Sequence, residues 1–107
     1  MEDPVVLKKK VCELANLMLK SDEDYLDNVL SIWRTGQRLL GEVWDTEFHV
    51  FGVIESDTDH LPLKNVRQHC SAEMLHKSEI ELAEIIQHYK KDVTEACNEI
   101  LAKHHHM

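Results

Sequence analysis

Residues 72–103 read AEMLHKSEIELAEIIQHYKKDVTEACNEILAK, and this stretch decides the fold. Its apolar side chains recur at alternating spacings of four and three, with one skip at Glu79, which is the period of one helix face. Ser71 is placed as an N-cap, and Glu73 lies in the first turn, where an acid complements the helix dipole. We therefore predict one helix over residues 72–103, roughly 48 Å long. The stripe consists of Leu75, Leu82, Ile86, Tyr89, Val93, Ala96 and Ile100.

Two shorter helices are predicted before this one, over residues 4–20 and 22–41. Asp3 is a favourable N-cap for the first, and Pro4 occupies the first helical position, where its missing N–H costs nothing. Ser21 is placed to cap the second helix. Because the link between the two helices is very short, we expect them to form an antiparallel hairpin.

The second predicted helix contains one glycine and ends at another. Gly41 is a favoured residue just after a helix end. Gly36 lies inside the helix, where glycine costs about 1 kcal/mol relative to alanine. We interpret Gly36 as a place where another backbone approaches closely.

Residues 44–70 do not follow a helical pattern. The run over residues 48–54 is rich in β-branched and aromatic side chains, which is typical of a buried strand. A polar turn is predicted to follow it, and residues 61–67 are a second, weaker extended candidate that contains Pro62. The predicted fold is mainly α: a three-helix antiparallel bundle with a short extended or β-hairpin insertion between helices 2 and 3.

The chain of 107 residues fits a single domain, which we place at residues 1–103. Residues 104–107 carry a histidine run, and we expect a disordered tail that takes no part in function. No apolar signal-peptide core or membrane-length run is present, and the three cysteines have no close pairs. These features indicate a cytoplasmic protein.

Charge limits the classes of partner. Twenty acidic residues against 12 basic ones give a formal net charge of −8. Such a charge repels phosphate backbones and anionic membranes, which argues against nucleic-acid and membrane partners. It speeds the encounter with a basic protein, although it also serves solubility alone.

Four residues of the last predicted helix form two pairs that could bind a metal. A Glu and a His three or four positions apart share a helix face, as in di-iron bundles. Such bundles also need ligands from other helices, and the first two predicted helices contain no histidine. Solvent-exposed pairs are therefore the favoured interpretation, and no cofactor is expected. The alternative is a metal-binding protein or enzyme that uses Glu73, His76, Glu84 and His88.

Aromatic and acidic residues gather in the middle segment. Surfaces that bind basic proteins combine such side chains. The same aromatics could instead form the core under the hairpin, because aromatic residues dominate cores as well as interfaces. The candidate partner-binding residues are Trp44, Phe48, Phe51, Glu55, Asp57 and Asp59.

This segment resembles a family of small uncharacterised bacterial proteins. Phe48 and Phe51 are followed by Ser-Asp-Thr-Asp-His-Leu-Pro at residues 56–62, which matches the acidic S-x-T-D-x-L-P stretch of that family, and then by Val66-Arg67 and a capped helix. The resemblance covers residues 44–100 and implies no catalytic residue. Some members resemble immunity proteins, which neutralise a secreted toxin inside the producing cell.

The sequence carries no catalytic or phosphate-binding motif, so a non-catalytic protein-binding module is the first hypothesis. An immunity-type inhibitor of a basic toxin such as a nuclease is one form of this hypothesis, which rests on the charge of −8 and on the aromatic and acidic segment. A homodimer is a further alternative, in which the predicted strand over residues 48–54 pairs with its symmetry mate.

Overall fold

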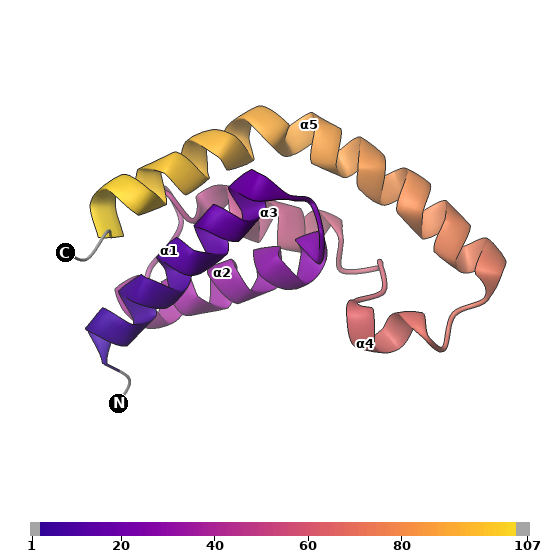
Figure 1. Ribbon diagram of the computed structural model, residues 1–107, viewed down its shortest axis with the longest axis horizontal. Helices are drawn as coiled ribbons and strands as arrows, with labels where there is room; N and C mark the ends of the chain where they lie inside the picture. The colour runs from indigo at the N-terminus through magenta and orange to yellow at the C-terminus, as the bar shows by residue number, and fades with distance from the viewer. Residues whose placement is uncertain (1–2, 105–107) are drawn as a thin grey trace.

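The computed structural model describes residues 3–104, and this part of the chain is helical without a strand. The long helix α5 curves along one side of the molecule (Figure 1). Helices α1, α2 and α3 pack beneath its C-terminal half, and α4 lies beneath its N-terminal half. The helices are α1 (Pro4–Lys20), α2 (Tyr25–Leu40), α3 (His49–Asp57), the single turn α4 (Lys64–Arg67) and α5 (Ala72–His104).

The local signals that predicted α1 and α5 are confirmed. The Asp3 carboxylate accepts a hydrogen bond from the Val5 N–H at 2.9 Å, as an N-cap does. Ser71 Oγ accepts from the Met74 N–H at 3.1 Å in the same way. Gly41 follows the last residue of α2 with φ of 80°, a value that favours glycine.

The start of α2 differs from the prediction, because the helix begins at Tyr25 rather than at residue 22. Ser21 does not cap it; the Ser21 hydroxyl accepts from the Glu23 N–H at 3.0 Å and so shapes the turn between the helices. Asp24 precedes α2 with φ of 54°, a left-handed conformation that aspartate tolerates better than most residues. The turn therefore takes up residues that were predicted as helix.

The prediction of a β-hairpin insertion is wrong. The prediction of a three-helix bundle is wrong as well, because residues 3–104 contain further helices and no strand. The run expected as a strand forms α3 instead, a further helix packed between α2 and α5. The predicted polar turn supplies the last residues of α3, and the second extended candidate contains α4. Residues 48–54 therefore cannot form a homodimer by strand pairing in this structure, because the backbone amides of α3 are hydrogen-bonded within the helix.

Packing explains why this segment is helical despite its β-favouring composition. Phe48, Phe51 and Ile54 recur every three residues, so that a helix turns all three to one side. All three side chains are fully buried. Tertiary burial of this face outweighs the strand propensity of its valines and isoleucine, which spans only about 1 kcal/mol.

Two glycines leave space for aromatic rings at the contact between α2 and α3. A Cβ added at Gly36 of α2 would lie 2.7 Å from the Phe48 ring. A Cβ added at Gly52 of α3 would lie 2.5 Å from the Trp33 ring. The close approach expected at Gly36 is therefore that of a side chain, not of a backbone.

The two halves of α5 differ in burial. Residues 72–92 contain no fully buried side chain, whereas Val93, Ala96, Cys97, Ile100 and His104 are all buried. Arg67 of α4 pairs with Glu79 at 2.9 Å, and His60 pairs with Glu81 at 2.7 Å. These two pairs connect the N-terminal half of α5 with the segment around α4, and Leu82, Ile85 and Ile86 of the same half pack partly buried against the core. Within residues 3–104, none of the helices combines the length and apolar character needed to cross a membrane.

We predict that Gly36→Ala destabilises the protein although alanine favours helices. The added methyl group meets the buried Phe48 ring, and such overpacking costs about 1–3 kcal/mol. The gain in helix propensity returns only about 1 kcal/mol. Chemical denaturation monitored by circular dichroism measures the difference.

The neighbouring Gln37→Ala is the matched control, because Gln37 is exposed on the same helix. Its free energy of unfolding should change by less than about 0.5 kcal/mol. Combining Gly36→Ala with Phe48→Leu should cost less than the sum of the two single changes. Strict additivity would contradict a contact between this residue pair.

Candidate functional site

A groove of about 350 Å³ opens between α3 and the C-terminal half of α5. Val50 and Val53 of α3 and Tyr89 of α5 give it an apolar floor. The residues that line it include no lysine or arginine. Its four carboxylates belong to Glu47, Asp92, Glu95 and Glu99.

Helix geometry explains how these side chains come together. Asp92, Glu95 and Glu99 are three and four positions apart on α5, so they occupy one face of the helix. Val50 and Val53 are three apart on α3, beside the face that enters the core. An acidic edge of one helix therefore borders an apolar edge of another.

One of the four carboxylates is buried and paired. Glu47 Oε1 lies 2.5 Å from His104 Nε2, and the two side chains are only 5% and 8% exposed. Lys103 Nζ lies 3.5 Å from the other Glu47 oxygen. The His104 ring also packs beside the Phe48 ring, with 5.6 Å between ring centres. This cluster fastens the loop before α3 to the end of α5.

The charge state of Glu47 follows from its surroundings. Burial raises the pKa of the Glu47 carboxyl. Hydrogen bonds from its own backbone N–H and from His104 lower this pKa, and together with the nearby Lys103 charge they outweigh burial, so the pKa lies below its ordinary value. Glu47 is therefore ionised near neutral pH. His104 is predicted from the sequence to lie in a disordered tail, and this is wrong, because it lies inside α5 and is buried; residues 105–107 lie outside the described residues.

Trp44 lies beside this groove and is 48% exposed. Its ring meets the Trp33 ring edge-on at 5.1 Å and the His49 ring at 4.9 Å. The Nδ1 atom of His49, which lines the groove, accepts a hydrogen bond from the Asp45 N–H at 3.2 Å. The exposed indole is therefore continuous with the acidic groove through His49.

The remaining candidate partner-binding residues are dispersed. Phe48 and Phe51 are in the core, as the alternative interpretation of these aromatics had it, and neither is exposed to a partner. Asp57 accepts a hydrogen bond from the Tyr89 hydroxyl, and this bond raises the pKa of Tyr89. Glu55 and Asp59 line a different depression, together with Arg34.

The four metal-ligand candidates all lie exposed on α5. Glu73 pairs with Lys77 at 3.4 Å, and the His88 ring packs edge-on against Tyr89 at 4.7 Å. Across residues 3–104, no group of three His, Cys, Asp or Glu side chains is arranged to hold a metal ion. Glu73, His76, Glu84 and His88 are not brought to one point.

Sequence reasoning missed the residues that form the groove. The signal for Asp92, Glu95 and Glu99 was present, because acids at this spacing mark one edge of a helical stripe. The pairing of Glu47 with His104 had no such signal, since 57 positions separate the two residues.

No family model, no curated protein and no solved structure matches this chain.

We predict that Glu47 contributes stability that is lost in acid. Because its folded-state pKa lies below the ordinary value of 4.5, the contribution is present above that pH and is lost as pH falls through the folded-state pKa. Glu47→Gln should therefore be less stable than the wild type at pH 7, by about 2 kcal/mol. The difference should shrink between about pH 5 and pH 3.

Urea denaturation at several pH values measures this difference. Glu99→Gln is the control, because Glu99 is half exposed and pairs only with Lys103 among the described residues. A gap between wild type and Glu47→Gln that stays constant down to pH 3 would contradict a stabilising role for the ionised Glu47 carboxylate.

Proposed function

We propose that this chain is a non-catalytic binding module whose acidic groove receives a basic segment of a partner protein. The observation that carries the proposal is the groove between α3 and α5, which combines an apolar floor with four carboxylates and no lining lysine or arginine. Apolar contact supplies affinity, and the carboxylates select for positive charge.

The shape of a basic side chain suits this combination. Lysine and arginine carry an apolar stem and a charged head, so the stem can lie on Val50, Val53 and Tyr89 while the head meets a carboxylate. Asp92 and Glu95 are exposed and have no ion pair within residues 3–104. Their charges are therefore available to a partner without the loss of an internal contact.

Trp44 supports a preference for arginine within that segment. A guanidinium stacks on an indole face and is more weakly hydrated than an ammonium group. Trp33 and His49 hold the Trp44 ring edge-on, so that part of the ring is fixed while about half of the residue stays exposed. Tryptophan is one of the residues most enriched at interface hot spots.

The biological form that we propose is an immunity-type inhibitor of a basic toxin such as a nuclease. The net charge of −8 and the acidic groove support it. An acidic inhibitor finds a basic nuclease quickly through electrostatic steering. Binding would block the nuclease by occupying the surface that otherwise attracts phosphate.

We predict that the chain binds a fluorescein-labelled amphipathic peptide of alternating leucine and arginine pairs, and that salt weakens this binding. Asp92→Lys and Glu95→Lys should each reduce affinity by about 3- to 10-fold, because each places a repulsive charge at the groove. Fluorescence anisotropy at low and high salt gives the affinities, and amide chemical-shift mapping locates the peptide.

Two charge reversals elsewhere serve as controls. Glu13→Lys lies on the exposed face of α1, and Asp59→Lys lies in the depression shared with Arg34. Both change the net charge by the same amount as the groove variants. Equal losses in all four variants would show that only net charge matters, and would contradict the groove as the site.

We further predict that Trp44→Leu weakens the arginine peptide about tenfold and the matching lysine peptide by less, because a leucine side chain cannot stack on a guanidinium. Trp44→Phe should restore part of the affinity. Since Trp33 is buried and Trp44 is exposed, a fluorescence change on binding reports mainly on Trp44. Equal effects of Trp44→Leu on the two peptides would contradict stacking.

A further inference from the structure

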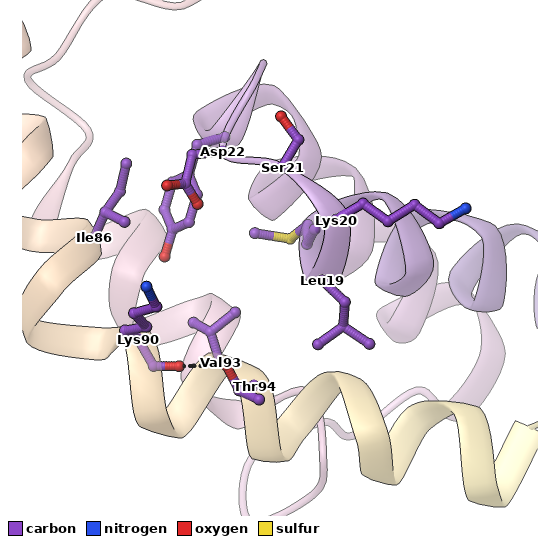
Figure 2. A pocket seen from close by; sticks show the side chains of 10 residues that line it. Leu19, Lys20, Ser21, Asp22, Ile86, Lys90, Val93 and Thr94 are labelled. Atoms are coloured by element: carbon purple, nitrogen blue, oxygen red, sulfur yellow. Dashed lines mark hydrogen bonds between the residues drawn. The ribbon is translucent and has the colours of Figure 1, made fainter.

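A second pocket lies away from the acidic groove, where the end of α1 and the α1–α2 turn face the middle of α5 (Figure 2). Its volume is about 190 Å³, which is room for a small molecule rather than for a single water. Ser21 and Asp22 border it from the turn, and Ile86, Lys90 and Val93 border it from α5.

Tyr25, the first residue of α2, also lines this pocket and is only 5% exposed. Its hydroxyl is the one buried side-chain polar atom in the described part of the chain that has no hydrogen-bond partner. A buried hydroxyl without a partner lowers stability, and a phenylalanine would fill the same space without that loss. The hydroxyl therefore points to a ligand that completes its hydrogen bond.

The phenol is fixed as a hydrogen-bond donor. Burial, and then the negative charge of Asp22, raise the pKa of Tyr25 above its ordinary value. The hydroxyl keeps its proton throughout the physiological range and can donate it to an acceptor. The missing partner is accordingly a group with an oxygen lone pair.

The other lining residues narrow the chemistry of that group. Lys90 and Asp22 place one positive and one negative charge at the pocket, in a chain whose net charge is −8. Figure 2 shows the Lys90 side chain rising from α5 toward the side where Asp22 lies, whereas Lys20 points away from the pocket. The apolar part of the lining comes from Met18, Leu19, Ile86 and Val93.

We propose that this pocket binds a small aliphatic carboxylate. The carboxylate accepts hydrogen bonds from the Tyr25 hydroxyl and the Lys90 ammonium group, and the aliphatic part contacts Ile86 and Val93. Asp22 is placed to pair with an ammonium group on the same molecule. The shared chemistry thus has two sources: a simple aliphatic acid, or an aliphatic amino acid that also uses Asp22.

Thermal denaturation with sodium 4-methylpentanoate and with L-leucine, each at up to about 10 mM, tests the site, because a ligand this small is expected to bind with a Kd of about 1 mM. Binding should raise the unfolding midpoint by about 5 °C at the highest concentration. Sodium chloride at the same ionic strength is the reference. If neither compound shifts the midpoint beyond that reference, the proposal is overturned.

The variant Tyr25→Phe separates a binding role from a structural one. Without ligand, its midpoint should equal or exceed that of the wild type, because the unpartnered hydroxyl is gone; with ligand, the shift should disappear. Tyr89→Phe is the matched control, since the Tyr89 hydroxyl bonds to Asp57 outside the pocket, and it should keep the ligand shift. A large ligand shift that survives in Tyr25→Phe would overturn the proposal.

Charged-residue variants identify the source of the carboxylate. Lys90→Met should weaken binding of both compounds, whereas its exposed neighbour Lys91→Met, which does not line this pocket, should not. Asp22→Asn should reduce the shift with L-leucine and leave the shift with 4-methylpentanoate, if the amino acid is the preferred ligand. Identical effects of Lys90→Met and Lys91→Met would show a general charge effect and contradict the site.

Discussion

The structure depends on a reciprocal contact in which each of two helices receives a ring from the other. Phe48, just before α3, packs against Gly36 of α2, and Trp33 of α2 packs against Gly52 of α3. Neither ring could lie where it does if its glycine carried a side chain, because a Cβ would come within 3 Å of it. Two glycines that weaken their own helices by about 1 kcal/mol each thereby allow the two rings to pack directly against the helix backbones.

This contact also positions the candidate groove. Fixing Phe48 fixes the residues on either side of it, so that Glu47 reaches His104 at the end of α5 and His49 supports the exposed Trp44. The two walls of the groove, α3 and α5, are therefore joined at one end by a buried acid–histidine pair and further along by the bond between Tyr89 and Asp57. A groove held at two points keeps its carboxylates in place before a partner arrives, which lowers the ordering cost of binding.

Sequence predicted the elements whose signals are local. The caps at Asp3, Ser71 and Gly41 and the stripe of α5 depend on residues within a few positions of one another. The prediction for residues 48–54 was wrong because their apolar positions are compatible with both a strand and a helix, and their local propensity favours a strand. The helix is favoured by contacts with Gly36 and Trp33 of α2. These residues are distant from residues 48–54 in sequence and become their neighbours only when the chain folds.

The candidate site divides in the same way. The sequence singled out an aromatic and acidic region, but it could not show which of its aromatic side chains are buried in the core. Phe48 and Phe51 are spaced to face inward together, whereas Trp44 lies in the preceding loop and is 48% exposed. The side chains that stay exposed are the Trp44 indole and a row of carboxylates on α5, namely Asp92, Glu95 and Glu99. Within that row, Asp92 and Glu95 have no ion pair inside residues 3–104 and repel one another, so their position beside an apolar floor favours a role in binding over one in folding.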